Sequence, residues 1–347
     1  MTDGKVRTLQ PLIDSCKEAG LTYSLLEEPD FKSKQARNPQ ALKFDFVFLI
    51  VVLMRKFFSS KKIIQNDQKI GSLFSNLFCF RRDVKNIVTV SQSFQSILRG
   101  MYSNATIFDY QHGILSNVFD GYTKNNRISD QIILNKANVL LHGNSFKQKL
   151  LKADGGDYFS NKSHVIGAPF SKYKKVTTEF NNCILISLQF STSHKTHQNQ
   201  KLYEGTLNFL KEIELSELNL KIYLRSHPRF DDCIDIKELY AFDFVYSAPL
   251  LIEECFDVCS LHITEYSTMV FDSIINGVPT ILSNFLEDFK ILQKEYSFEQ
   301  KDENLFRLVN KMFDKEFYFK LIQFQTKWSK TYYEPFNSGV FLKTLNK

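Results

Sequence analysis

The chain has 347 residues, of which 43% are hydrophobic and 24% charged, and its formal net charge is +6. This length favours two domains, since ordinary domains hold about 100 to 200 residues each. The positive charge is mild and dispersed and no RNA- or DNA-binding motif is present, which argues against a nucleic-acid partner and fits an acidic ligand such as a nucleotide. No stretch has the composition of a disordered segment, so we expect a folded chain.

The cysteines are scattered: Cys16, Cys79, Cys183, Cys233, Cys255 and Cys259. Only Cys255 and Cys259 are close in sequence, and they have helical spacing rather than the two-residue gap of a zinc or redox loop. No signal peptide precedes them. We therefore expect reduced thiols in a cytoplasmic protein, with no metal site and no cofactor.

The strongest apolar run is FDFVFLIVVLM, at 44–54. Asp45 interrupts this run, which is about half as long as the ~20 residues that a membrane-spanning helix needs. We expect a buried parallel strand here. The segment that follows, RKFFSSKK at 55–62, is basic and aromatic, so it is either a solvated turn or a contact with an anionic surface.

In the first half, short apolar runs alternate with helix-sized polar stretches. Beyond the run at 44–54, strands are predicted in four segments, 85–91, 105–113, 138–144 and 163–169, and helices in 91–104 and 145–159. Apolar runs of this length with helix-sized gaps indicate crossover units and a parallel sheet.

The pattern restarts after a lysine-rich linker near 170–180. It predicts strands in 183–193, 220–228, 242–247, 260–267 and 278–284, helices in 201–217, 249–259 and 268–277, and a helical tail. We expect an α/β protein with two Rossmann-like, doubly wound domains facing a central cleft, at 1–172 and 173–325. The last helix, within 326–347, is expected to cross back to the first domain.

Doubly wound domains bind their ligands beyond the carboxyl ends of their strands, so polar residues at strand ends are the candidates for a site. The first is in LHITEYSTMVFDSIINGVPTILSN, at 261–284. Ser267 and Thr268 occupy N-cap positions, where free backbone N–H groups and the helix dipole attract phosphate. Two interpretations stay open: a cap alone, or an anion site that includes Glu265 and Tyr266.

The second candidate is YLRSHPRF, at 223–230, where Pro228 ends an apolar strand. It leaves His227 at the tip and Arg225 on the same face two residues earlier. An imidazole and a permanently charged guanidinium suit a phosphate group. The alternative is an ordinary surface turn.

The third candidate is ATIFDYQHGILSN, at 105–117. A strand ends there at Asp109 to Gln111, and His112 and Gly113 form a tight turn at which a ligand could approach the backbone. His112 is placed to act as general base toward an acceptor hydroxyl, with Asp109 orienting it or acting as the base itself. The alternative is a structural histidine.

The fourth candidate is Gln189, after the strand in ILISLQFSTSHK, where a hydroxyl-rich loop is the alternative. Other motifs are missing. No G-x-G-x-x-G follows a strand, and there is neither a Walker lysine loop nor a G-x-S-x-G elbow, which argues against ATPases and most serine hydrolases.

Taken in order, four motifs resemble a known group: H-G at 112–113, R-x-H-P at 225–228, E-Y-S-T at 265–268 and G-x-P at 277–279. The chain is similar to the GT-B glycosyltransferases and phosphotransferases of bacterial surface polysaccharides. These include the CDP-glycerol glycerophosphotransferases of teichoic-acid synthesis and the CMP-sialic acid and CMP-Kdo transferases of capsules. The resemblance spans roughly residues 105–285 and implies the GT-B fold.

The resemblance also implies roles. His227, Ser267 and Thr268 would bind the donor phosphates, and His112 would be the acceptor base. This chain departs from the family at two positions, since Gln111 replaces the usual tryptophan and Glu265 replaces aspartate.

The function implied is a metal-independent glycosyltransferase that uses a CMP- or CDP-linked donor to extend a capsule, lipopolysaccharide or teichoic-acid-like polymer. Its partners would be the nucleotide-sugar donor and a saccharide or lipid-linked acceptor, with peripheral association at the inner face of the plasma membrane. Three alternatives stay open: a polyol-phosphate transferase of the same fold, a sugar-nucleotide epimerase, and a non-catalytic scaffold in a polysaccharide assembly complex.

Overall fold

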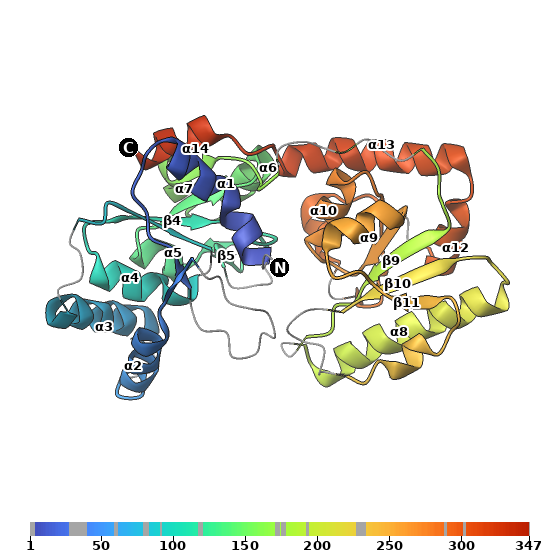
Figure 1. Cartoon of the computed structure of the whole chain (residues 1–347), viewed down its shortest axis with the longest axis horizontal. Helices are drawn as coiled ribbons and strands as arrows, with labels where there is room; N and C mark the ends of the chain where they lie inside the picture. The colour runs from blue at the N-terminus through green and yellow to red at the C-terminus, as the bar shows by residue number, and fades with distance from the viewer. Residues whose placement is uncertain are drawn as a thin grey trace. The chain divides into compact units, whose positions relative to one another are not determined.

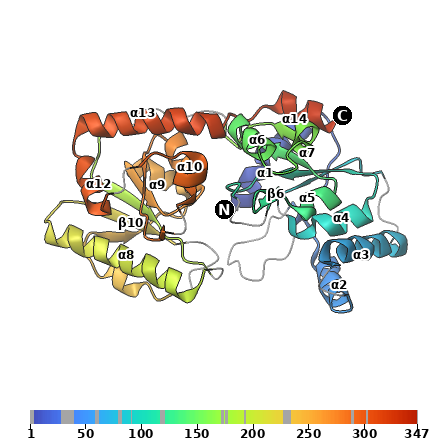
Figure 2. The same cartoon turned by 180° about the vertical axis from the view of Figure 1, so that it is seen from behind.

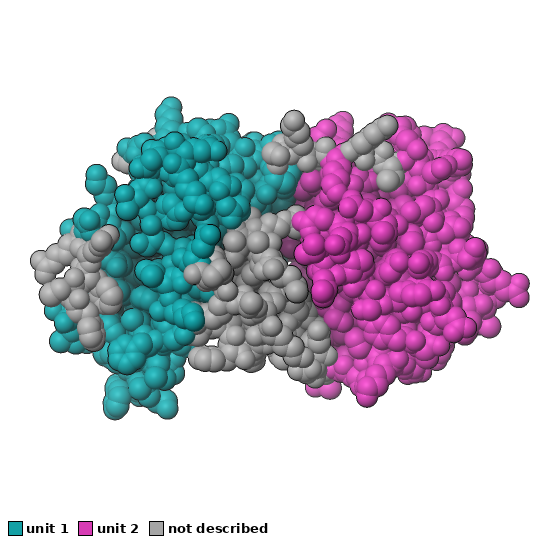
Figure 3. All heavy atoms as spheres, in the orientation of Figure 1, with its two compact units in different colours: residues 1–171, 331–347 teal, residues 172–330 magenta. Residues whose placement is uncertain are grey.

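A computed structural model describes residues 4–27, 40–58, 62–78, 83–90, 92–116, 121–170, 174, 178–191, 194–226, 234–287, 290–300 and 303–346. The chain divides into two compact units (Figure 3). Unit 1 comprises residues 1–171 and 331–347, and unit 2 comprises residues 172–330.

In the described part of unit 1, four parallel strands form a sheet in the order β3-β4-β7-β8. They are β3 (Asn86–Thr89), β4 (Thr106–Tyr110), β7 (Asn138–Leu141) and β8 (Ser163–Val165). These strands confirm the four predictions between 85 and 169. Because all four strands are parallel, their carboxyl ends lie along one edge of the sheet.

Alternate residues of these strands face opposite layers of helices. Phe108 and Tyr110 of β4 pack against Leu12 of α1 and Phe341 of α14. The helices of unit 1 are α1 (Gly4–Glu18), α2 (Asp45–Arg55), α3 (Ile63–Phe78), α4 (Gln95–Met101), α5 (Asp130–Leu134), α6 (Asn144–Leu151), α7 (Tyr158–Lys162) and α14 (Ser338–Leu345). Two short strand pairs complete it: β1 (Leu26–Glu27) with β2 (Leu42–Lys43), and β5 (Thr123–Lys124) with β6 (Arg127–Ile128).

The run at 44–54 forms α2, so the strand predicted there is wrong. An apolar run without alternation fits a buried strand and a buried helix equally well, and eleven residues exceed the usual strand length. Asp45 in the first turn and Arg55 in the last turn both suit the helix dipole. Arg55 also donates two hydrogen bonds to Asp67 of α3, at 2.8 and 2.6 Å.

In the described part of unit 2, five parallel strands form a sheet in the order β11-β10-β9-β12-β13. They are β9 (Cys183–Ser187), β10 (Lys221–Arg225), β11 (Val245–Ser247), β12 (Leu261–Thr264) and β13 (Thr280–Leu282), and they confirm the predicted strands. The chain winds from β9 to β11 in one direction and then crosses to β12 on the other side of β9. The sheet therefore has a topological switch point between β9 and β12, where α/β proteins bind ligands.

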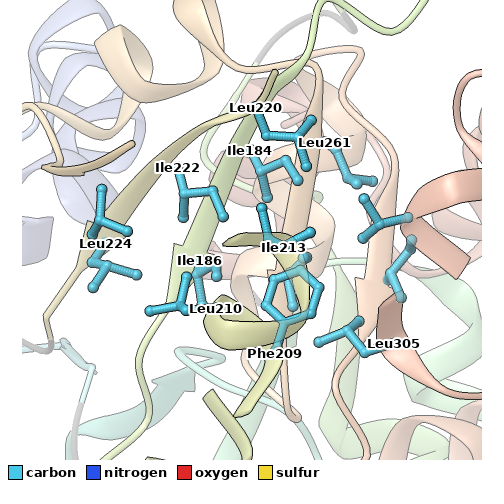
Figure 4. Close-up of a cluster of buried hydrophobic side chains, with 14 of the residues drawn as sticks. Ile184, Ile186, Phe209, Leu210, Ile213, Leu220, Ile222, Leu224, Leu261 and Leu305 are labelled. Atoms are coloured by element: carbon cyan, nitrogen blue, oxygen red, sulfur yellow. The ribbon is translucent and has the colours of Figure 1, made fainter. Parts of the chain in front are cut away.

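Helices cover both faces of the unit 2 sheet (Figures 1 and 2). Ile184 and Ile186 of β9 pack against α8 in the main core (Figure 4), while Leu185 faces the other way, toward α9. The helices are α8 (Thr196–Leu215), α9 (Ile252–Val258), α10 (Met269–Ile275), α11 (Ile291–Tyr296), α12 (Leu305–Lys311) and α13 (Lys315–Tyr332), with a 3-10 turn at Lys237–Tyr240.

After α13 the chain packs against the strand ends of unit 1. Ala168 forms a parallel bridge with Pro335, and Glu334 N donates to the carbonyl of His142 at 2.9 Å. Two glycines permit this approach. A Cβ on Gly143 would lie 2.2 Å from the Tyr332 carbonyl oxygen, and one on Gly167 would lie 2.3 Å from that of Pro335.

Replacing Gly143 by alanine should therefore loosen the C-terminal segment. The new methyl group overlaps backbone rather than a flexible side chain, and overpacking of this kind costs about 1 to 3 kcal/mol. Hydrogen exchange of the amides in 333–346 should be faster by the corresponding factor. The matched control is Gly339→Ala in α14, where a Cβ meets only the side chain of Asn337, at 3.5 Å. Equal exchange in the two variants would contradict the packing argument.

Candidate functional site

Gln189 joins the two loops at the switch point of unit 2. Its Oε1 accepts three hydrogen bonds, from Thr264 Oγ1, Glu265 N and Tyr266 N, each 2.8 Å long. One side chain after β9 thus holds the end of β12 and the first two residues beyond it. The sequence analysis predicts that Gln189 touches the nucleotide. In the structure, its side-chain oxygen holds the loop that contains Glu265 and Tyr266.

The carboxylate of Glu265 is buried and faces the loop after β13 (Thr280–Leu282). It accepts hydrogen bonds from Ser283 Oγ, from Phe285 N at 3.0 Å and from Leu286 N at 2.8 Å. Three donors therefore occupy the oxygens of this predicted substrate-binding residue. Glu265 ties β12 to β13 and directs the neighbouring residues outward.

Tyr266 is half-buried, and its hydroxyl makes a very short hydrogen bond with His194 Nε2. Burial raises the pKa of Tyr266, and the charge of Glu265 raises it further, so the hydroxyl keeps its proton. His194 Nδ1 lies 3.0 Å from Asn199 Oδ1, which is an acceptor only. His194 Nδ1 therefore donates a hydrogen bond to Asn199.

Ser267 and Thr268 lie half-exposed at the start of α10. Ser267 Oγ accepts a hydrogen bond from Met269 N at 3.2 Å, and its own hydrogen is available to a ligand. Thr268 is the N-cap residue and makes no capping bond with its side chain. Both predicted phosphate-binding hydroxyls thus stand at the switch point, on a helix of only seven residues.

A buried polar chain lies beneath this loop. Ser187 Oγ is 2.9 Å from His262 Nε2, and His262 Nδ1 is 2.9 Å from Thr280 Oγ1. Burial lowers the pKa of His262 to about 3, so the ring is neutral. These two side-chain hydrogen bonds link β9, β12 and β13 across the sheet and support the register of the strands that carry the candidate site.

Arg225 stands at the end of β10, as predicted, and its guanidinium points to the loop before α9. It donates to the carbonyl of Pro249 at 2.9 Å and to that of Leu250 at 3.2 Å. Arg225 could offer a phosphate its fixed positive charge and the N–H groups that these two bonds leave over. His227 and Pro228 lie outside the described residues.

In unit 1, Asp109 is fully buried on β4. Its carboxylate accepts from Thr89 Oγ1 at 2.9 Å and from Gln92 Nε2 at 3.0 Å, and the Tyr122 hydroxyl faces it. Burial raises the pKa of Asp109, while the hydrogen bonds from Gln92 and Thr89, the nearby Tyr122 hydroxyl and the charge of His112 oppose that rise. A carboxylate held this way orients its neighbours and cannot reach an acceptor hydroxyl directly.

His112 is exposed just beyond β4, on a turn that Gln111 holds in place. Gln111 is buried; its Oε1 accepts from His142 N at 3.0 Å, and its Nε2 donates to the Gly113 carbonyl at 3.0 Å. Among the described residues, no atom would lie within 4 Å of a Cβ on Gly113, so these residues leave the space beside the turn open. Of the two predicted bases, only His112 is accessible.

His142, directly after β7, is a buried histidine that the sequence analysis passed over. Its ring lies edge-on to Tyr110 and Tyr333, at centroid distances of 5.2 and 4.9 Å. Neither ring nitrogen has a hydrogen-bond partner among the described residues. Burial, together with the charge of His112, lowers the pKa of His142 to about 3.

A groove of about 1350 Å³ opens in unit 1 beside this network. Gln92 lines the groove and also bonds to Asp109, so the buried carboxylate lies one side chain behind the wall. Gln131 donates to the Gln92 carbonyl at 3.1 Å. The lining mixes amides with aromatic and charged side chains, among them Arg55, Arg127 and Tyr158, which suits a polar ligand.

The residues that sequence reasoning missed are those that hold the loops: His194, Asn199, His142, Thr89 and Gln92. His194 lies in the same strand-end stretch as Gln189, so its position was a signal. Asn199 lies on α8 and Gln92 in a segment predicted as a helix, while Thr89 and His142 lie in segments predicted as strands. Their pairing depends on contacts between distant parts of the sequence.

No protein-family model matches this sequence, and neither does any curated protein sequence. Solved structures do match. The UDP-GlcNAc 2-epimerase of Neisseria meningitidis bound to UDP-GlcNAc has a TM-score of 0.58 at 12% identity, over 99% of this chain and 97% of that one. MnaA of S. aureus with UDP has a TM-score of 0.58 at 12% identity, over 99% and 93%. A variant of the wall teichoic acid polymerase TagF has a TM-score of 0.54 at 12% identity, over 98% and 84%.

These matches span both units and show the fold. The chain has the GT-B fold, with a Rossmann-like unit 1 and a Rossmann-like unit 2, as predicted.

Gln189→Leu should destabilise unit 2, because three donors lose their acceptor. The expected loss is about 1 to 3 kcal/mol in the free energy of unfolding. The single tryptophan, Trp328, stacks on Phe271 in unit 2, so its fluorescence during urea unfolding reports this unit. Gln189→Glu keeps an acceptor oxygen and should recover most of the stability. If leucine and glutamate cost the same, the three-bond arrangement is not what holds the loop.

His142→Phe should flatten the loss of stability in acid. The unfolded chain protonates this histidine near its ordinary pKa of 6.5, whereas the folded chain does so only near 3. Stability is therefore lost as the pH falls from 6.5 toward 3, by about 1.4 kcal/mol per pH unit. Denaturant unfolding followed by circular dichroism should show this slope in the parent and a smaller one in the variant, with similar stability at pH 7. Parallel profiles would contradict the assignment.

Proposed function

We propose that this protein is a glycosyltransferase that moves a sugar from a nucleotide-activated donor, with CMP or CDP favoured as the nucleotide, to a hydroxyl of a growing bacterial surface polysaccharide. The observation that carries the proposal is the switch point of unit 2. There Gln189 holds a loop that presents Ser267 and Thr268 at the carboxyl ends of β9 and β12. The GT-B fold and the teichoic acid polymerase among its structural matches support it.

In this proposal unit 2 binds the donor phosphates. Ser267 and Thr268 donate their hydroxyl hydrogens, and His227 contributes an imidazole N–H as the resemblance implies. Arg225 adds a fixed positive charge while its N–H groups hold the carbonyls of Pro249 and Leu250. Donors fixed in advance stabilise the charge that grows on a departing phosphate, which requires no metal ion.

Unit 1 supplies the acceptor side. The acceptor oxygen forms a bond to the anomeric carbon of the donor, and the bond from that carbon to the phosphate oxygen breaks, with both electrons leaving on the phosphate. His112 takes the proton of the acceptor hydroxyl. Gln111 fixes the turn that carries His112, and Asp109 lies buried nearby on β4.

A polyol-phosphate transferase would use the same groups with attack at phosphorus. A second candidate function is a UDP-sugar 2-epimerase. It is favoured by one observation, the match over 99% of this chain to the epimerase that was solved with UDP-GlcNAc bound. The two candidates differ in product: an epimerase changes the sugar while it stays on the nucleotide, and a transferase releases the nucleotide.

The proposal predicts that a CMP-, CDP- or UDP-activated donor raises the melting temperature of the protein by mass action. With an acceptor polymer present, the nucleotide should be released and chelators should leave the rate unchanged. His112→Ala should lower kcat by roughly 10²- to 10⁴-fold, as loss of a general base does, while nucleotide affinity is retained.

The matched control is His197→Ala, which removes an exposed histidine on α8. It should leave kcat unchanged. Conversion of UDP-GlcNAc to its epimer without release of nucleotide would favour the second candidate. Failure of every nucleotide to bind would overturn both candidates and favour a scaffold.

A further inference from the structure

We propose that unit 1 docks on the surface of an anionic lipid bilayer through α2. The docking surface, the α2 apolar face, consists of Phe46, Leu49, Leu53 and Phe57. Their exposed fractions are 68%, 56%, 47% and 88%. Side chains of this kind are seldom left in water together unless they bind something.

Phe46, Leu49 and Leu53 are three and four residues apart, close to whole turns of an α-helix, so they lie on one side of α2. Phe57 follows in the turn after Arg55, where its N–H donates to the Met54 carbonyl. Val51, on the opposite side, is fully buried in a core that includes Ile70 of α3 and Ile97 of α4. The fold of unit 1 therefore uses only one side of α2, and the second apolar side is left for a partner.

The position of α2 suits docking. In both views α2 extends away from the sheet of unit 1 (Figures 1 and 2). Its eleven residues span about 16 Å, roughly half of a bilayer core of about 30 Å. The described parts of the chain hold no helix that is long and apolar enough to cross a membrane. The geometry therefore favours a helix lying in the plane of the interface.

The charges around the face select the kind of bilayer. Lys43, Lys56 and Lys62 are exposed at the two ends of the helix, against one exposed acidic residue of the same described stretch, Asp45. Arg55 is paired with Asp67 and adds no net charge. Apolar side chains flanked by lysines complement acyl chains beneath anionic headgroups.

The C-terminal end of α2 borders the groove of unit 1. Arg55 and Phe58, together with Ile63 and Ile64 of α3, line it. A bilayer held at the α2 apolar face would thus bring a lipid-linked acceptor to the groove. This last step rests on the proposed function, whereas the docking itself does not.

The test is co-sedimentation with vesicles of phosphatidylcholine, alone or mixed with phosphatidylglycerol. The protein should bind the mixed vesicles more tightly, and rising salt should weaken that binding. A Phe46→Ser, Leu49→Ser double variant should bind at least about tenfold less, because two inserted side chains are lost. Lys56→Ala and Lys62→Ala should each lower affinity about fivefold at low salt.

The matched control is Leu215→Ser, which changes a leucine of unit 2 that is 84% exposed, and it should leave vesicle binding intact. Circular dichroism should be unchanged in all variants, since every altered side chain is exposed. Equal binding by the double variant and the parent would overturn the proposal, as would equal binding to both kinds of vesicle. So would a dimer in sedimentation velocity that the double variant abolishes without any vesicle binding.

Nucleotide binding by the double variant separates the two proposals. It should match the parent. Vesicle binding without nucleotide binding would remove the proposed function and leave the docking surface in place.

Discussion

The acceptor oxygen of Gln189 is the contact on which the candidate site of unit 2 depends. In a parallel sheet the loops at a switch point diverge, because consecutive crossovers leave in opposite directions. A single amide after β9 reconnects them by accepting from Thr264, Glu265 and Tyr266. Glu265 then ties the same loop to the one after β13, and Tyr266 ties it to His194. The side chains of Gln189, Glu265 and Tyr266 thus have structural partners, whereas those of Ser267 and Thr268 are half-exposed.

Unit 1 follows the same division between buried and exposed groups. Asp109 and Gln111 are fully buried and each makes two side-chain hydrogen bonds to the described residues, whereas His112 between Gln111 and Gly113 is exposed. A buried carboxylate is costly unless donors surround it, and Thr89 and Gln92 provide them. In both units, therefore, a buried side chain with several hydrogen bonds shapes the turn, and a neighbouring side chain is left more exposed.

The GT-B fold by itself does not select a reaction. The matched structures include an epimerase and a polymerase, and they share the fold with this chain at 12% identity. Reactions on a common fold differ through a few side chains at strand ends and through the surfaces that present the substrate. For this chain we propose that those features are the turn at His112, the loop at Ser267 and the α2 apolar face.

The strands that carry the site could be predicted from the sequence, because a strand buried on both sides must be a short apolar run, and polar residues directly after it must lie at the sheet edge. That reasoning found His112, Gln189 and Ser267 at their observed positions. It failed at 44–54, because a run that is apolar on all sides is compatible with both a strand and a helix.

What the sequence by itself determined is where the strands of the two sheets lie along the chain and which polar residues stand at their ends. Only the tertiary structure decided which of those residues are free to act. Glu265, Gln111 and Asp109 look as available as Ser267 when read along the chain, yet their hydrogen-bond partners come from other elements. The same holds for the outward face of α2. Burial and hydrogen bonding are properties of packed neighbours, and neighbours distant in sequence are set only when the chain has folded.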